Sequence, residues 1–196
     1  MARDLFSDTD VVQVVDDREG GIRYWPAFAS PDEADAWFEV LSARVPWASH
    51  RRQMYDRTVD VPRLLASWPV DALPDGLPLA DMLERVCGVV PAPYNAVGLN
   101  LYRDGRDSVA MHNDRLHTIV PGQPITLVSL GDARRMLVRA KDGARERHAI
   151  DLVHGSLLAM SHASQLSHEH GIPKTARAVG PRMSVVFRVR PPAHAE

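Results

Sequence analysis

The chain has 196 residues, which at roughly 150 residues per domain favours a single domain. Its residues are 45% hydrophobic and 24% charged, a composition that excludes a disordered or fibrous protein. No apolar run reaches the roughly 18 residues of a membrane helix, the start lacks the apolar core of a secretion signal, and the one cysteine cannot form an internal disulfide. These features predict a cytoplasmic monomer that contacts no membrane.

The formal net charge is only −2, with 23 basic and 25 acidic residues. The first 40 residues carry three Arg against ten acids, and the rest carry twenty basic residues against fifteen acids. Nearly all basic residues are Arg, which recognises phosphate and carboxylate through its rigid fork. A GC-rich bacterial genome explains this bias equally well, so charge alone identifies no nucleic-acid-binding protein.

The first elements in the chain are a short strand over 11–15 and a helix that begins after Ser30. Ser30 is placed as N-cap, Pro31 at the first helical position and Glu33 as the partner that closes a capping box. Apolar residues then recur at helical spacing and predict one buried face, at Ala34, Trp37, Phe38 and Leu41. A second helix is predicted from Leu79 to Val86, with Gly88 just beyond its end as the C′ residue.

Short β-type runs dominate the sequence after Pro91. Six strands are predicted, over residues 96–102, 125–130, 136–140, 148–152, 156–160 and 183–189. A hairpin turn is predicted at residues 141–144, between two of them. Helices followed by many short strands indicate an α+β protein with an antiparallel sandwich or barrel.

A candidate metal site begins at His112 and Asp114. These residues are two apart, so on an extended chain both side chains leave from the same face. A third ligand from His170 would complete the two-His, one-carboxylate facial triad of non-haem Fe(II) oxygenases. His168 shares a face with His170 and is the alternative third ligand.

A candidate anion site lies in the last strand. Arg182 and Arg188 share one face with Ser184, and two guanidinium groups inside a barrel require anionic partners. A dicarboxylate ligand would supply them, because Arg pairs bidentately with carboxylates. Asn100 and Tyr102 are likewise two apart and would add neutral hydrogen bonds from another strand. The alternative is an exposed strand face with ordinary surface charges.

Five linked motifs over residues 95–190 resemble the AlkB family of Fe(II)- and 2-oxoglutarate-dependent nucleic-acid dealkylases. They are Asn100-Leu101-Tyr102-Arg103-Asp104-Gly105, His112-x-Asp114, His154-Gly155-Ser156-Leu157-Leu158-x-Met160, His170-x-x-Pro173 and Arg182-x5-Arg188. The resemblance implies a double-stranded β-helix, or jelly roll, with N-terminal helices buttressing one sheet. It divides the single domain into an N-terminal extension over 1–92, with a candidate nucleotide lid, and a catalytic core over 93–190.

The resemblance also implies roles for individual residues. His112, Asp114 and His170 would be the iron ligands and the catalytic centre. Five residues would bind 2-oxoglutarate: Arg182 and Tyr102 at its far carboxylate, and Asn100, Ser184 and Arg188 nearer the iron-chelating end. Ser184 replaces the Asn that is usual in the family, and Leu116 replaces an acid that repair enzymes often carry two residues after the metal Asp.

A basic segment supplies the candidate substrate contacts. Arg51, Arg52, Met54 and Tyr55, followed by Arg63, could hold a phosphate backbone and stack a flipped base. In the family, the corresponding region forms a lid over the nucleotide. The alternative is a solvated charged loop.

The implied activity is an oxidative demethylase that uses Fe(II), 2-oxoglutarate and O2 to repair alkylated bases in DNA, with RNA left open. One alternative is an oxygenase of the same fold that hydroxylates a protein side chain or a small molecule. A more distant alternative is a non-enzymatic binding protein with a jelly-roll core.

Overall fold

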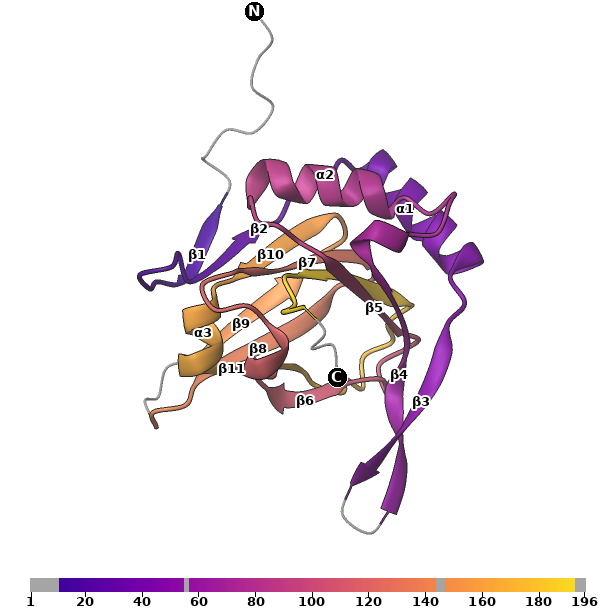
Figure 1. Ribbon diagram of the computed structural model, residues 1–196. Helices are drawn as coiled ribbons and strands as arrows, with labels where there is room; N and C mark the ends of the chain where they lie inside the picture. The colour runs from indigo at the N-terminus through magenta and orange to yellow at the C-terminus, as the bar shows by residue number, and fades with distance from the viewer. Residues whose placement is uncertain (1–10, 55–56, 144–146, 193–196) are drawn as a thin grey trace, which may run out of the picture.

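In the computed structural model of the chain, the described residues are 11–54, 57–143 and 147–192, without the side chains of residues 50–60. Two antiparallel sheets face each other (Figure 1). The larger sheet has the order β1 (Val12–Val15), β2 (Ile22–Trp25), β10 (Ser156–Met160), β7 (Ile125–Gly131), β12 (Arg182–Arg188), β5 (Ala96–Tyr102), β4 (Arg57–Pro69) and β3 (Ala48–Met54). The smaller sheet has the order β6 (Val109–His112), β11 (His168–Ile172), β8 (Arg134–Ala140) and β9 (Arg147–Leu152).

This arrangement confirms the predicted α+β jelly roll. One apolar core lies between the sheets and includes Leu127, Met136 and Val186. A second core lies between the outer face of the larger sheet and two helices, α1 (Pro31–Arg44) and α2 (Leu79–Val89). Both helices therefore buttress one sheet, as predicted, and Figure 1 shows them together on that face. The division at residue 92 stays a prediction.

Helix α1 begins where the sequence predicts, but only half of the capping box forms. The hydroxyl of Ser30 accepts a hydrogen bond from the backbone N–H of Glu33. The Glu33 carboxylate accepts two 2.6 Å hydrogen bonds from Arg85 of α2. A charged partner outweighs a neutral backbone donor, so this carboxylate links the two helices.

Helix α2 extends beyond its predicted end. Gly88 lies inside the helix, which ends at Val89, so its placement as C′ residue was wrong. The backbone N–H of Val90 still donates to the carbonyl oxygen of Val86, and Val90 is buried. Pro91 follows and offers no N–H to continue the helix.

The predicted strands match β5 and β10 at both ends, and the others begin or end within one or two residues of the observed bounds. Part of the predicted 141–144 turn lies outside the described residues, although β8 and β9 do pair antiparallel. Five observed strands were not predicted: β2, β3, β4, β6 and β11. Three short helices complete the described elements, η2 (Val70–Ala72), η3 (Leu116–Thr118) and α3 (His162–Ser167). Within the described ranges, each helix is too short or too polar to cross a membrane.

Strand β12 has the alternation that the sequence predicts. Met183, Val185 and Phe187 belong to the core beneath the helices. Arg182 and Arg188 point to the other side, into the space between the sheets. Hydrogen bonds to β5 on one side and β7 on the other hold β12 in the middle of the larger sheet.

Candidate metal and cosubstrate site

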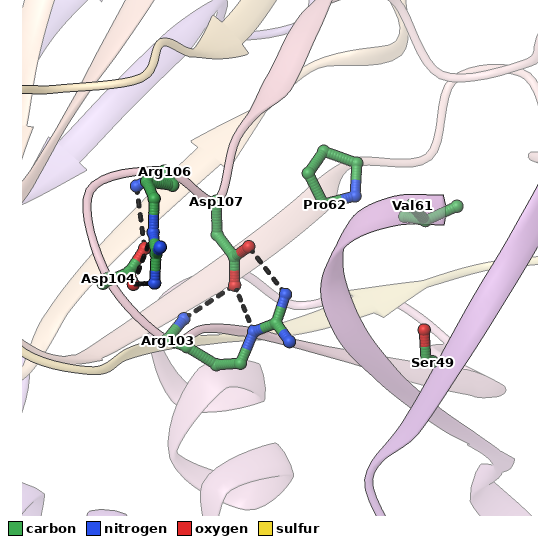
Figure 2. A pocket seen from close by; sticks show the side chains of 7 residues that line it. All are labelled: Ser49, Val61, Pro62, Arg103, Asp104, Arg106 and Asp107. Atoms are coloured by element: carbon green, nitrogen blue, oxygen red, sulfur yellow. Dashed lines mark hydrogen bonds and ion pairs between the residues drawn. The ribbon is translucent and has the colours of Figure 1, made fainter. Parts of the chain in front are cut away.

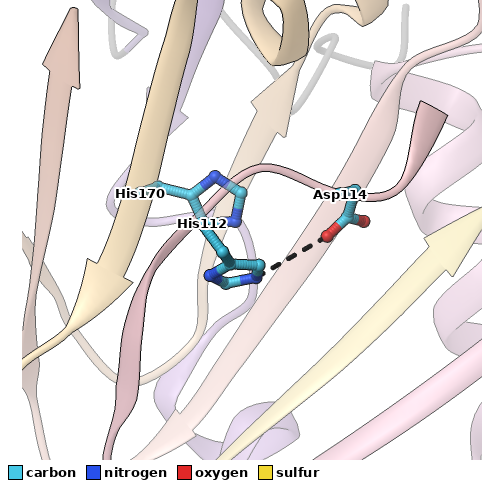
Figure 3. A group of neighbouring side chains, drawn as sticks. All are labelled: His112, Asp114 and His170. Atoms are coloured by element: carbon cyan, nitrogen blue, oxygen red, sulfur yellow. Dashed lines mark ion pairs between the residues drawn. The ribbon is translucent and has the colours of Figure 1, made fainter. Parts of the chain in front are cut away.

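Three potential metal ligands meet between the two sheets (Figure 3). The ligand atoms of His112, Asp114 and His170 all lie within 4.8 Å of one another. His112 ends β6 and pairs in register with His170 on β11, so their ring centroids are only 4.5 Å apart. Asp114 follows two residues after the end of β6, and its Oδ1 lies 3.8 Å from His112 Nε2.

A glycine allows the two histidine strands to approach closely. Gly171 lies opposite the β6 backbone, and a Cβ atom there would be 3.0 Å from the nitrogen of Met111 and the carbonyl oxygen of Val109. Both neighbours are backbone atoms, which cannot rotate away as a side chain can. The absence of a side chain at Gly171 therefore helps to set the spacing of the two imidazoles.

Two side chains hold Asp114, one at its carboxylate and the other at its backbone N–H. Arg188 Nε donates a 2.6 Å hydrogen bond to Asp114 Oδ2, which leaves Oδ1 on the side of the histidines. Gln165 of α3, 1% exposed, accepts a 3.0 Å hydrogen bond from the Asp114 backbone N–H. Sequence reasoning missed Gln165, because nothing in its short polar helix marks it as a neighbour of Asp114.

The charge states of these groups suit a metal site. Burial raises the pKa of the Asp114 carboxyl, but the charge and hydrogen bond of Arg188 outweigh it and bring the pKa below its usual value. Burial and the neighbouring His112 lower the pKa of His170 to about 4. At neutral pH the site thus offers a carboxylate and at least one neutral imidazole, the forms that bind a metal.

The triad lines a cavity of about 80 Å³, and Arg182 lies in the same cavity. Arg182 is fully buried, and its Nε donates to the Ser129 hydroxyl. Its two terminal nitrogens have no hydrogen-bond partner among the described residues. The guanidinium carbon lies 5.1 Å from the ring centroid of Tyr102. A buried guanidinium with two free donors fits a carboxylate-bearing ligand.

A polar chain crosses the same cavity. Asn100 Nδ2 donates to the Ser184 hydroxyl at 3.2 Å, and Asn100 Oδ1 accepts a 2.8 Å hydrogen bond from Arg63 Nε. Sequence reasoning grouped Arg63 with the basic segment before it, but its side chain lines the cavity. The spacing of charges in the sequence carries no signal for this placement. The placement depends on β4, a strand that the sequence did not predict.

Other sequence predictions lie away from this cavity. His168 is buried, but its contact is with the neighbouring Ser167 hydroxyl and it does not join the triad. Leu116 lies in η3, is 38% exposed and does not line the cavity. The proposed substrate contacts, Arg51, Arg52, Met54 and Tyr55, lie outside the described side chains.

A second hollow, of about 440 Å³, is lined by residues of β3, β4 and the loop that follows β5 (Figure 2). Its charged side chains are paired with one another: Arg103 with Asp107, and Arg106 with Asp104. No group of metal-ligating side chains was found here or elsewhere in the described residues, apart from the triad.

Comparisons with known proteins agree with this geometry. The profile of the 2OG-Fe(II) oxygenase superfamily matches residues 63–188. DNA oxidative demethylase ALKBH2 of Mus musculus is 33% identical over 178 residues, covering 80% of this chain and 74% of the relative. ALKBH2 of Homo sapiens is 32% identical and covers 80% of this chain and 68% of the relative. A solved structure of OsALKBH1 shares the fold, with a TM-score of 0.63 and 14% identity over 87% of this chain and 97% of that one. The chain therefore belongs to the AlkB family within the 2OG-Fe(II) oxygenase superfamily.

Proposed function

We propose that this protein is an Fe(II)- and 2-oxoglutarate-dependent dioxygenase that oxidatively demethylates alkylated bases in DNA. The observation that carries this proposal is the meeting of a His-Asp-His group and a buried, partly unpaired Arg182 in one cavity. The names of its ALKBH2 relatives, which are DNA oxidative demethylases, supply the substrate class.

His112, Asp114 and His170 would hold the iron. Two imidazoles and one carboxylate on one side of the ion leave other coordination positions open for the cosubstrate and O2. The Arg188 hydrogen bond would fix which carboxylate oxygen faces the metal. Gln165 would fix the backbone that carries this carboxylate.

Arg182 would bind the far carboxylate of 2-oxoglutarate through its two terminal nitrogens, with Tyr102 packed against the guanidinium. Asn100, Ser184 and Arg188 would line the end of the cosubstrate nearer the metal. Because Ser184 already accepts a hydrogen bond from Asn100, its hydroxyl would orient the Asn100 amide as well as the ligand.

When bound, Fe(II) and 2-oxoglutarate would supply the chemistry by which O2 oxidises the alkyl carbon on the base. The oxidised carbon then leaves as formaldehyde, and 2-oxoglutarate becomes succinate and CO2. The chain itself binds, orients and excludes water. Apolar side chains line much of the cavity and would limit solvent access to the metal: Val109, Leu127, Met136, Met160, Ile172 and Val186.

Four residues of the β3–β4 segment would contact the nucleic acid: Arg51, Arg52, Met54 and Tyr55. Their types support this role, since guanidinium groups hold phosphates and an aromatic ring stacks on a base. We propose DNA as the nucleic acid that these residues contact, with RNA as the alternative substrate.

The test is incubation of iron-loaded protein with oligonucleotides that carry methylated or etheno-modified bases, followed by mass spectrometry. We expect loss of the alkyl group with one succinate formed per event, and no loss without iron or 2-oxoglutarate. Undamaged oligonucleotides of the same sequence are the control. If no modified DNA or RNA is altered, while peptides or small molecules stimulate succinate formation, the substrate proposal is wrong.

A further inference from the structure

Helix α3 links two of the three residues of the metal site. Its residue Gln165 is almost fully buried and accepts the 3.0 Å hydrogen bond from the Asp114 backbone N–H. The helix then runs directly into β11, which carries His170. With six residues, α3 is far below the roughly 12–15 residues at which isolated helices become stable in water. Contacts from outside the helix must therefore hold Gln165 in place.

The first of these contacts come from the β1–β2 turn, residues 16–21, which lies beside α3 (Figure 1). The Glu19 carboxylate accepts a 2.7 Å hydrogen bond from the backbone N–H of Ala163, in the first turn of the helix. The Asp17 carboxylate accepts a 2.6 Å hydrogen bond from the hydroxyl of Ser161, the N-cap residue. Two acids thus meet the end of the helix where free N–H groups favour negative charge.

The backbone of the β1–β2 turn is itself held at several points. Asp17 Oδ1 accepts hydrogen bonds from the backbone N–H groups of Glu19 at 2.8 Å and Gly21 at 2.9 Å. The Gly21 carbonyl oxygen accepts a further bond, at 2.8 Å, from the Ser161 N–H. Gly21 has a φ of +65°, and a Cβ atom there would lie 1.8 Å from the carbonyl oxygen of Val15. This close turn presents both carboxylates to α3 in one arrangement.

A lysine meets the other end of α3. Lys141 Nζ donates to the carbonyl oxygens of Gln165 at 2.6 Å and Leu166 at 3.3 Å. The backbone N–H of Lys141 donates to the Ser167 carbonyl oxygen at 2.9 Å. The last carbonyl groups of a helix favour a cation, so each end of α3 has a charged partner of the favourable sign.

We infer that Glu19 and Lys141 are positioning residues for the metal site, which hold α3 at its two ends and so keep Gln165 on the backbone of Asp114. The inference rests on the metal site of the proposed function. Neither residue lines the cavity of the triad, so each acts through Gln165. Metal binds the arrangement in which Asp114 is held, and its apparent affinity falls with the fraction of molecules in that arrangement. Loss of either end contact should therefore weaken metal binding.

The experiment measures binding of Co(II), as a substitute for Fe(II) that requires no turnover, by calorimetry. We expect Glu19→Ala and Lys141→Met each to weaken Co(II) binding by about threefold to tenfold, or ~0.7–1.4 kcal/mol, the size of a lost helix cap. Glu19→Gln keeps an oxygen acceptor for the Ala163 N–H, and Lys141→Arg keeps the charge and its donors. Both conservative variants should bind Co(II) nearly as tightly as the wild type.

A matched control separates positioning from general stability. Ser30 is the N-cap of α1, which packs on the outer face of the larger sheet, away from the metal site. Ser30→Ala should lower the melting temperature and leave the Co(II) affinity unchanged. A second test uses Gln165→Met as the background. There, Glu19→Ala should have little further effect on Co(II) binding, because the contact through which Glu19 acts is already gone.

Three results overturn the inference while the metal site stands: unchanged Co(II) affinity in Glu19→Ala or Lys141→Met, an equal loss of affinity in Ser30→Ala, or a full effect of Glu19→Ala in the Gln165→Met background. A different result concerns the proposed function itself. If wild-type protein binds Co(II) no more tightly than Asp114→Ala does, the metal site is wrong, and the proposed function with it.

Discussion

Arg188 Nε and Asp114 Oδ2 lie 2.6 Å apart, so the last residue of β12 reaches from the larger sheet to the loop after β6. This pair connects the two sheets at the metal site. The carboxylate has one oxygen committed to the arginine and the other on the side of the histidines. Orientation of the third ligand therefore depends on a residue that lies 74 positions away in the sequence.

The identity of the distal histidine ligand can be tested with two equally buried residues, since His168 and His170 are each 8% exposed. His170→Ala should abolish metal-dependent turnover of 2-oxoglutarate, because it removes one of three ligands. His168→Ala should keep turnover and serves as the control for loss of a buried ring from β11. Metal binding measured by calorimetry checks both, and the opposite pattern would exchange the assignments.

Arg182 should determine the affinity for 2-oxoglutarate. Removing one member of a buried charge pair costs about 3–5 kcal/mol, so Arg182→Met should raise the KM for 2-oxoglutarate about a hundredfold or more. Arg134 offers a contrast, because it is also buried but its donors bind the carbonyl oxygens of Asp104, Asp107 and Pro173.

For Arg134→Met, each unsatisfied buried acceptor costs about 1–3 kcal/mol, so this variant should lower the melting temperature. The KM for 2-oxoglutarate of its folded fraction should stay near that of the wild type. A KM that Arg182→Met leaves unchanged would place the cosubstrate elsewhere.

Gln165 should act through the position of Asp114. Gln165→Met removes the acceptor for the Asp114 N–H and should weaken metal binding by about tenfold to a hundredfold, the range for groups that orient metal ligands. The KM for oligonucleotide should change little. Ser167→Ala, on the same helix, removes a hydroxyl that bonds the carbonyl oxygen of Ala163 and should leave metal affinity unaltered. Equal effects of the two variants would indicate a general role of α3 in stability.

Gly171 should be required for the spacing of the two imidazoles. In Gly171→Ala, the new methyl group would press on backbone atoms of β6 at 3.0 Å, so the strands must separate. We expect weaker metal binding and a lower melting temperature, with the apo protein still folded. Gly143, with open space around its Cβ position but a positive φ of 81°, is a control in which strain arises without contact with the site. Gly143→Ala should lower stability without changing metal affinity.

Much of the fold follows from local sequence patterns. Strands β5, β7, β10 and β12 are rich in apolar residues and bounded by turn residues, so their positions are readable. Strands β6 and β11 were missed because their few residues include His112, His168 and His170, which interrupt apolar alternation. The site residues in these strands were found from the spacing of their chemical groups and from family resemblance. Arg63 and Gln165 could not be placed, because tertiary packing alone brings Arg63 to the cavity and Gln165 to the backbone of Asp114.

The two halves of the site belong to parts of the molecule that should open with different ease. Arg182 and Ser184 lie on a central strand with hydrogen-bonded neighbours on both sides, whereas His112 ends a four-residue strand at the edge of the smaller sheet. Amide hydrogens of β12 should therefore exchange with solvent only on global unfolding, and those of β6 by local opening. Because metal binds neither the locally opened form nor the unfolded chain, adding it should slow exchange in both strands by a similar factor, and β6 should remain the faster class. The cosubstrate anchor and the metal-bearing edge would then be visible as two separate exchange classes, both with and without metal.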